Sequence, residues 1–217
     1  MSSREGIGMT SMRTRERLVR RLQEQGIRAP AVLGRIRDVP RHLFMDEALA
    51  SRAYEDTALP IGLGQTISQP YVVARMTEAL IEAGAPEKVL EVGTGCGYQT
   101  AVLAPLVGKV FSVEYLKPLL RKARQNVAAL SLYNVRYRQG DGWQGWSKYA
   151  PYDGIIVAAA PELIPTALLE QLADGGRMVL PVGPPRNQRL MRITRTDNDY
   201  RQEDLGGVSF VPLVRST

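Results

Sequence analysis

The chain has 217 residues, of which 44% are hydrophobic and 23% are charged, as in an ordinary soluble globular domain. No stretch approaches the ~20 uninterrupted apolar residues of a membrane span, and the arginine-rich start contains no secretory signal. The single cysteine excludes an internal disulfide framework and a zinc site built from several cysteines. We therefore expect a cytoplasmic protein with no membrane partner and no bound metal.

The net charge of +6 raises the possibility of nucleic-acid binding. Six arginines crowd the N-terminal part of the chain: Arg4, Arg13, Arg15, Arg17, Arg20 and Arg21. The remainder is nearly balanced. Such a run is more often the solvated face of a helix than a nucleic-acid surface, and aromatic residues are not interleaved with it. We therefore expect no nucleic-acid partner.

The N-terminal part of the chain has helical patterns but no strand pattern. Residues 1–11 lack periodicity, and we expect them to be disordered. An arginine-rich helix follows and ends at Gly26, a second extends from Pro30 to Val39, and a third covers Leu43 to Ala53. These pieces predict an N-terminal helical region over residues 12–58.

Residues 59–71 are too rich in glycine for a helix and too apolar for a linker. We interpret them as an ordered loop that packs against the rest of the protein. Ser68 is placed to cap the following helix, with Pro70 in its first turn and its end near Gly84.

From residue 72 onward, strand patterns alternate with helix patterns. Strands are predicted at 88–92, 109–113, 134–138, 154–158 and 177–181. Helices begin near Tyr98 and Pro118, and a later one covers 165–172. This alternation predicts an α/β fold with a Rossmann-like, mostly parallel sheet and helices on both faces.

The pattern changes after Pro181. Residues 190–194 and 208–211 have strand patterns, and only a short polar stretch connects them. We expect an antiparallel pair that closes one edge of the sheet. Residues 1–217 are predicted to form one domain, with its core over 72–217.

The most informative motif is the first core strand, which is followed at once by Gly93, Gly95 and Gly97. Glycines in this position let the backbone approach a ligand closely. No further glycine completes the GxGxxG dinucleotide pattern, and bulky Tyr98 follows the turn. These features favour S-adenosylmethionine, a nucleoside cofactor without phosphates, over NAD.

Three carboxylates are predicted at the ends of neighbouring strands. Glu91 either holds the amino group of the cofactor or is a core carboxylate satisfied by loop amides. Glu114 follows Gly95 by 19 positions, near the ~20-residue offset at which a carboxylate reaches ribose hydroxyls. Asp141, between two glycines, is placed to accept a hydrogen bond from the adenine amino group. Ligands of open α/β sheets bind in the crevice at these strand ends.

Two other reactive side chains have simpler interpretations. Cys96 lies inside the glycine turn, where a small packed residue is expected in place of a nucleophile. His42 has no acidic or cysteine partner at a telling spacing, so we expect a packed or surface histidine.

Several segments occur together in one enzyme family: 39–44, 53–56, 59–62, 65–68, 89–97, 152–157, 175–183 and 210–213. With them, the chain resembles the protein-L-isoaspartate O-methyltransferase family of the bacterial type. The glycine turn is shared by a whole superfamily. The Thr66-Ile67-Ser68 loop, joined to the Pro181-Val182-Gly183 segment, is specific to this family.

The resemblance implies that Ser68 lies beside the transferring methyl group, so that 59–71 is an active-site loop. It implies cofactor contacts at Gln65, Thr66, Ile67, Ser68, Gly93, Glu114, Asp141 and Gly142. Tyr71 stands where many members have a histidine, and we expect it to replace that cofactor contact. The implied reaction transfers the methyl group of S-adenosylmethionine to the free carboxylate of L-isoaspartyl residues in damaged proteins and peptides, which starts repair through a succinimide. We expect a monomer.

Three alternatives stay open. A methyltransferase acting on nucleic acid is disfavoured, because Ala158-Ala159-Ala160-Pro161 offers no side-chain acceptor for a base amine. A non-catalytic protein of the same fold is disfavoured by the intact glycines, Glu114 and Ser68. A dehydrogenase is disfavoured by the missing pyrophosphate glycine.

Overall fold

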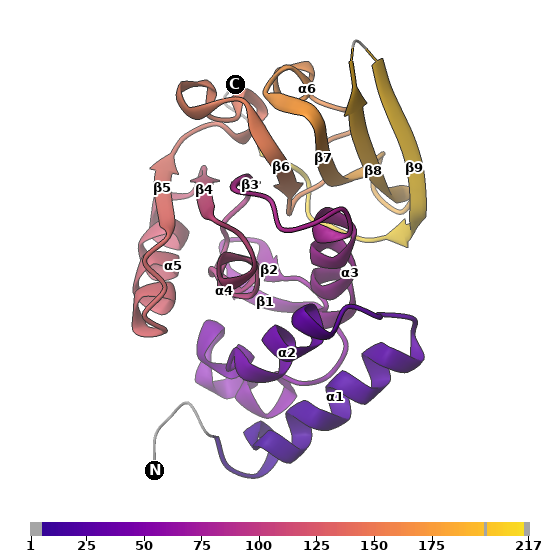
Figure 1. Ribbon diagram of the computed structural model, residues 1–217. Helices are drawn as coiled ribbons and strands as arrows, with labels where there is room; N and C mark the ends of the chain where they lie inside the picture. Colours follow the sequence, from indigo (N-terminus) through magenta and orange to yellow (C-terminus); the bar gives the residue numbers. More distant parts are fainter. Residues whose placement is uncertain (1–5, 198, 215–217) are drawn as a thin grey trace.

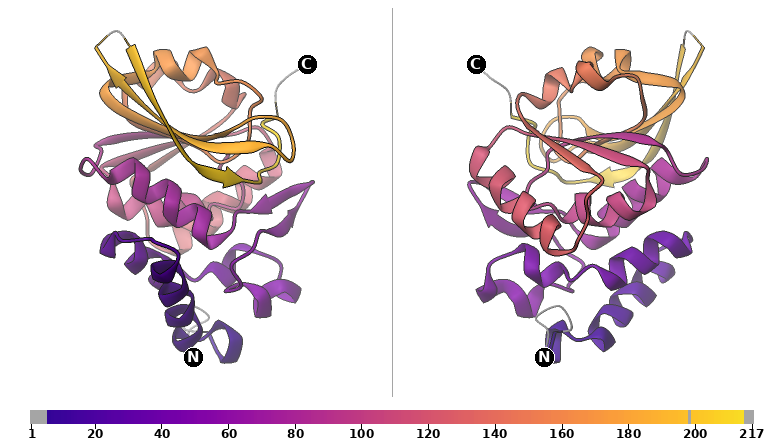
Figure 2. Two further views of the ribbon diagram at one scale, coloured as in Figure 1. Left: turned by 90° about the vertical axis from the view of Figure 1, so that its right-hand side faces the viewer. Right: turned by 60° about the vertical axis from the view of Figure 1, so that its left-hand side comes forward.

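Figure 1 shows the computed structural model of the protein, which describes residues 6–197 and 199–214. Its centre is a seven-stranded sheet with the order β5-β4-β3-β6-β7-β8-β9. The N-terminal helices lie together on one side of the molecule, away from the sheet (Figures 1 and 2). The predicted fold class is confirmed: a mostly parallel sheet with antiparallel C-terminal strands and an N-terminal helical region.

The N-terminal region contains two α-helices and two 3-10 helices. They are α1 (Met12–Glu24), α2 (Pro30–Asp38), η2 (Arg41–Phe44) and η3 (Glu47–Arg52). The segment expected to form a third helix is therefore a pair of short 3-10 helices. Asp46 separates them, because its side chain accepts a hydrogen bond of 2.9 Å from the Ala48 N–H and so caps a new turn.

The start of the chain differs in part from the expected disorder. Residues 1–5 lie outside the described part. Gly8–Thr10 forms the one-turn 3-10 helix η1, closed by the hydrogen bond of 3.1 Å from the Thr10 N–H to the Ile7 carbonyl.

Within the segment expected to form an ordered loop, residues 59–67 form a β-hairpin. Strand β1 (Leu59–Gly62) pairs antiparallel with β2 (Gln65–Ile67). Helix α3 (Pro70–Ile81) follows directly, and its N-cap is Gln69, so the expectation that Ser68 caps it is wrong. Pro70 occupies the first turn as predicted, because that turn needs no intrahelical N–H.

The first four parallel strands match the predicted strands closely. The parallel strands are β3 (Lys88–Val92), β4 (Lys109–Glu114), β5 (Val135–Gln139), β6 (Tyr152–Val157) and β7 (Leu172–Val182). The helices between them are α4 (Tyr98–Leu103), η4 (Ala104–Leu106), α5 (Lys117–Ala129), η5 (Gly142–Gln144), η6 (Ser147–Tyr149) and α6 (Thr166–Glu170). The fifth strand begins at Leu172, inside the segment predicted as the end of a helix, because α6 ends at Glu170.

The last two strands form a long antiparallel hairpin, β8 (Gln188–Thr196) and β9 (Asp199–Val208). The prediction placed the second strand at 208–211 and treated the preceding polar stretch as a connection. That stretch is the strand itself. Asp197 adopts a left-handed φ of 53° at the turn, and β9 is an edge strand that needs few apolar residues.

Side chains alternate between the two faces of the sheet and build two buried clusters. On one face, Leu90, Phe111 and Ile155 pack with Leu168 of α6. On the other, Val89 and Ile156 belong to a cluster with side chains of α3 and α4. The N-terminal region packs beneath α3 and α4, so the sheet, its helices and this region form successive layers (Figure 2).

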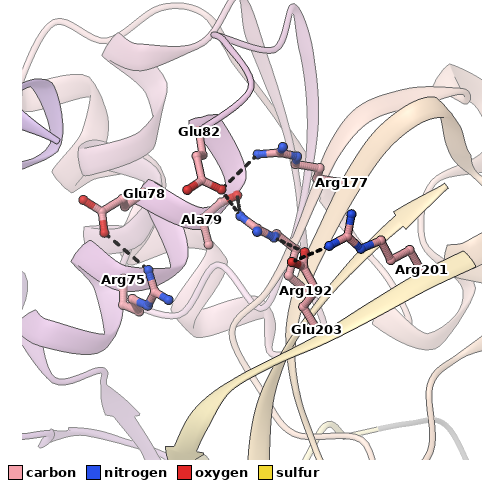
Figure 3. Close-up of polar contacts among 8 residues, drawn as sticks. All are labelled: Arg75, Glu78, Ala79, Glu82, Arg177, Arg192, Arg201 and Glu203. Carbon is pink, nitrogen blue, oxygen red and sulfur yellow. Dashed lines mark hydrogen bonds and ion pairs between the residues drawn. The ribbon is translucent and has the colours of Figure 1, made fainter. Parts of the chain in front are cut away.

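An ion-pair network fixes the C-terminal end of α3 to the sheet (Figure 3). The Glu82 carboxylate pairs with Arg177 of β7 and with Arg192 of β8. Arg192 also donates a hydrogen bond of 2.7 Å from Nε to Glu203 of β9. Helix α3 is therefore held at one end by these charges and leads at its other end directly into the β1–β2 hairpin. No helix in the described ranges is long and apolar enough to cross a membrane.

Candidate active site

A cleft of about 750 Å³, including its open mouth, lies where the central parallel strands end. Eight of the predicted site residues line it: Gln65, Thr66, Ile67, Ser68, Gly93, Gly95, Glu114 and Gly142. They come from the β2 strand, the turn after β3, the end of β4 and the turn after β5.

Glu114 organises the glycine turn as well as lining the cleft. Its Oε2 atom accepts a hydrogen bond of 2.8 Å from the Gly95 N–H, and its Oε1 atom accepts one of 2.9 Å from the Leu116 N–H. The carboxylate thus bridges the turns after β3 and β4. Each oxygen retains a second lone pair that can accept from a ligand hydroxyl.

Gly97 belongs to the motif but does not line the cleft. It has a left-handed φ of 89°, and a Cβ atom there would lie 3.2 Å from Ala123. Its role in the fold is close packing of α4 against α5.

Glu91 lies beneath the cleft and does not line it. Its Oε2 atom accepts hydrogen bonds of 2.6 Å from the Thr100 hydroxyl and 2.5 Å from the Ser112 hydroxyl. Its Oε1 atom is buried without a hydrogen-bond partner among the described residues. Burial raises the pKa of Glu91 to about 7, so the neutral acid is substantially populated at neutral pH. The structure places it as a core carboxylate whose Oε2 atom is satisfied by hydroxyls and not by loop amides.

The turn after β5 brings Gly142, but not Asp141, to the cleft wall. The Asp141 side chain caps η5 by accepting a hydrogen bond of 2.9 Å from the Trp143 N–H. A Cβ atom on Gly142 would lie 2.5 Å from Val92, so only glycine fits between the turn and β3. Backbone and capping geometry therefore shape this side of the cleft.

Ser68 lies at the end of the β1–β2 hairpin and faces the cleft. Its main-chain carbonyl accepts a hydrogen bond of 2.9 Å from Nη1 of Arg41, which is fully buried. Its hydroxyl has no hydrogen-bond partner within residues 6–197 and 199–214, so it is available to a ligand. The backbone is fixed while the side-chain oxygen is not committed.

Tyr71 does not line the cleft. Tyr71 lies in the first turn of α3, where its N–H donates a hydrogen bond of 2.9 Å to the Asp56 carboxylate. Its ring packs against the apolar core. The structure therefore does not bring Tyr71 together with the other predicted cofactor residues.

A C-terminal segment that the predicted site did not include forms another wall. Residues 211–214 line the cleft, and the Leu213 N–H donates a hydrogen bond of 2.9 Å to the Ala160 carbonyl. Trp143 Nε1 donates one of 3.2 Å to the Leu213 carbonyl. Long-range pairing places this segment, so the sequence indicated a strand pattern and a family motif here but not a wall of the cleft.

Other lining residues missed by the prediction include Thr94, Tyr115 and Leu116. Their only signal was proximity in sequence to the glycine turn and to Glu114. Cys96 also lines the cleft, but burial raises the pKa of its thiol, which disfavours a thiolate nucleophile. No cluster of three potential metal ligands occurs among the described residues.

Comparison with known proteins identifies the family. The sequence model described as Protein-L-isoaspartate(D-aspartate) O-methyltransferase (PCMT) matches residues 13–217. The chain belongs to this family. The protein-L-isoaspartate O-methyltransferase of Halorhodospira halophila is 62% identical over 209 residues, covering 96% of this chain and 95% of that protein. Protein-L-isoaspartate O-methyltransferase 1 of Nitrosococcus oceani is 61% identical, covering 96% and 99%.

Solved structures of PCMT proteins have the same fold. One protein-L-isoaspartate O-methyltransferase superimposes with a TM-score of 0.82 at 29% identity, covering 91% of this chain and 65% of that chain. A putative family member from Plasmodium falciparum, solved in complex with S-adenosyl-L-homocysteine, has a TM-score of 0.80 at 25% identity and covers 93% and 99%.

Proposed function

We propose that the cleft binds S-adenosylmethionine and transfers its methyl group to the free carboxylate of L-isoaspartyl residues in proteins and peptides. The observation that carries this proposal is the position of the uncommitted Ser68 hydroxyl on the cleft wall that also includes the glycine turn. Membership of the PCMT family supports the same reaction.

The residues of the cleft fit this cofactor. Gly93 and Gly95 leave the turn open, and Glu114 offers acceptor positions to the ribose hydroxyls. Gln65, Thr66 and Ile67 bring a strand edge to the opposite side. Among the predicted contacts, we assign cofactor binding to these residues with Gly142. Glu91, Gly97, Asp141 and Tyr71 support the fold around them.

This methyl transfer needs little acid–base catalysis from the protein. When bound, S-adenosylmethionine supplies an electrophilic methyl group on a positively charged sulfur. A carboxylate with an ordinary pKa of ~3.9 is ionised at neutral pH, so no general base is required. This agrees with a cleft that has no histidine among its lining residues. The protein contributes by alignment and by exclusion of water, because opposite charges disappear as the reaction proceeds.

Ser68 orients the substrate carboxylate in this proposal. Its hydroxyl donates a hydrogen bond to one carboxylate oxygen, while the hydrogen bond from Arg41 fixes the main chain behind it. The backbone amide nitrogen that follows then attacks the methyl ester and expels methanol, which forms a succinimide without help from the enzyme. Hydrolysis of the succinimide returns part of the residue to normal aspartate, which makes the reaction a repair.

A labelled methyl-transfer assay tests the proposal with two peptides that differ only in isoaspartate against aspartate. We expect label only in the isoaspartyl peptide. Equal labelling of both peptides, or labelling of RNA or DNA alone, would contradict the substrate assignment. A cytoplasmic location and a monomeric state remain predictions, and light scattering of the purified protein checks the second.

A further inference from the structure

The net charge of the protein comes from one part of the chain. Residues 115–150 contain seven lysines and arginines but only one acidic residue, Asp141. The rest of the chain therefore contains 21 basic and 21 acidic residues. This excess of six equals the net charge of the whole protein. The sequence interpretation located the charge in the N-terminal helix and missed this second concentration.

The fold gathers six of these cations on one exposed edge, which we call the basic edge: Lys117, Arg121, Arg124, Arg136, Arg138 and Lys148. They flank β5, the outermost strand of the sheet, on both of its faces. Lys117, Arg121 and Arg124 lie on α5, which packs on the face of Tyr137. Arg136 and Arg138 of β5 lie on the opposite face. Figure 1 shows β5 and α5 together at the end of the sheet opposite β9, and Figure 2 brings them to the front.

Aromatic rings support the guanidinium groups of the basic edge. Arg136 lies 5.3 Å above the Tyr149 ring and donates a hydrogen bond of 3.0 Å to its hydroxyl. Arg138 lies 5.8 Å above the Trp146 ring. Stacking on a ring orients a guanidinium without neutralising its charge. Arg136 and Arg138 are therefore both positioned and unneutralised.

The opposite edge of the sheet is built differently. There Arg189 pairs with Asp204 at 2.8 Å. Arg192 pairs with Glu203 at 2.7 Å (Figure 3). No cation of the basic edge has a carboxylate within 4.0 Å in the part of the chain that the structure describes. Charged side chains of either sign, or of both signs together, protect an edge strand from aggregation. Protection alone therefore does not explain why the charges of the basic edge are all positive.

The basic edge also adjoins the reaction cleft. Lys117, Arg121 and Arg124 line a second cavity, together with Gln139 at the end of β5. Leu116 and Leu119, within the same turn of chain, line the reaction cleft. The start of α5 is therefore shared by the cleft and the cationic cavity, so a polypeptide longer than a few residues can reach both.

We propose that the basic edge binds an acidic segment of the polypeptide substrate outside the reaction cleft, so that acidic proteins are the favoured substrates. This rests on the proposed function, since it presumes a polypeptide substrate. Arg136 and Arg138 are alternate residues of a strand, about 6.6 Å apart along it. An extended segment with alternating acidic residues matches this spacing, and it can pair with the free backbone edge of β5.

Nucleic acid is the less suitable occupant. Binding of single strands uses exposed aromatic faces on which bases stack. The rings of the basic edge are occupied, because Tyr149 contacts both Arg136 and Phe111, with 4.5 Å between the centroids of Tyr149 and Phe111. The Trp146 ring also contacts Phe111, at 5.8 Å.

The test measures kcat/KM for two isoaspartyl peptides joined by a flexible linker to a 12-residue tail, which spans up to ~40 Å. One tail alternates Glu with Thr, and the other replaces each Glu with Gln. We expect the acidic tail to raise kcat/KM about fivefold at low salt through KM, and the difference to vanish at ~0.5 M salt. The double variant Arg136→Gln/Arg138→Gln should lose the difference while its activity on the neutral peptide is unchanged.

A matched control is Arg189→Gln/Arg201→Gln, which removes two exposed arginines from the opposite edge and should keep the preference. Equal kcat/KM for both tails, or a preference that survives in the Arg136/Arg138 variant, would overturn the proposal. The proposal would also be overturned if a labelled RNA oligonucleotide bound more tightly than the acidic tail and if this RNA binding were lost in the Arg136/Arg138 variant. Binding of the acidic tail alone, measured by fluorescence anisotropy, separates failure of this proposal from failure of methyl transfer.

Discussion

The guanidinium of Arg41 donates a hydrogen bond of 2.9 Å to the main-chain carbonyl of Ser68. The same group donates to the carbonyls of Ala53 at 2.8 Å and Thr57 at 3.1 Å, and it lies 4.9 Å above the Tyr98 ring. One buried cation therefore connects the N-terminal region to the active-site hairpin. Burial lowers the pKa of Arg41, yet arginine remains charged at any physiological pH.

Replacing Arg41 with lysine is expected to lower both stability and turnover. A lysine ammonium cannot reproduce the planar fork that reaches three carbonyls, so at least one buried acceptor loses its partner, at a cost of about 2 kcal/mol. Urea unfolding measures this loss, and kcat should fall because Ser68 is less firmly held. Arg37→Lys, at an exposed pair with Asp38, is the control and should change stability by less than ~0.5 kcal/mol.

Ser68→Ala should lower turnover by roughly one to two orders of magnitude, the scale of losing a positioned donor. Binding of S-adenosylhomocysteine should change little, because the main chain at residue 68 is held through its carbonyl. Steady-state kinetics and calorimetry separate the two effects. Wild-type turnover in this variant would remove Ser68 from the mechanism, and Ser147→Ala, on the exposed helix η6, is the neutral control.

Glu114→Ala should mainly weaken cofactor binding. It removes two charge-assisted hydrogen bonds to the turns and the predicted bonds to ribose. At about 1.5–3 kcal/mol, the cost corresponds to a roughly 10- to 100-fold higher Kd for S-adenosylhomocysteine. Calorimetry that found an unaltered affinity would refute the ribose assignment. Glu162→Gln, at an exposed position, serves for comparison.

Glu91 should make stability depend on pH. Its pKa is about 7 in the folded protein, against an ordinary value of 4.5. Below pH 4.5, Glu91 is protonated in both the folded and the unfolded protein. Between the two values only the unfolded state releases the proton, so the free energy of unfolding falls as the pH rises through this window and levels off above it.

Glu91→Gln should remove this dependence, which amounts to roughly 3 kcal/mol from the separation of the two pKa values. Urea unfolding between about pH 4.5 and 8 measures it. The variant should lose less stability than the wild type as the pH rises. A curve parallel to that of the wild type would show that Glu91 titrates normally. Glu170→Gln, at an exposed position, controls for the loss of a carboxylate.

Local signals in the sequence predicted the βα units well. The strand before Gly93, the proline at the start of α3 and the turn around Gly142 depend on residues close together in the chain. The local signals failed where strand pairing overrides composition. The polar segment β9 is a strand because β8 supplies its hydrogen bonds. A segment's own residues do not reveal that partner.

The sequence by itself determined the parallel sheet, the glycine turn after β3 and the proline at the start of α3, because periodicity, glycine and proline act over a few residues. Only the tertiary structure decided that Glu91 is a core acid while Glu114 lines the cleft. Both follow apolar strand residues, and burial is set by which elements pack above each one. Tertiary structure likewise gathered the basic edge and placed Arg41 behind Ser68, since charges far apart in the chain interact only after folding brings them together.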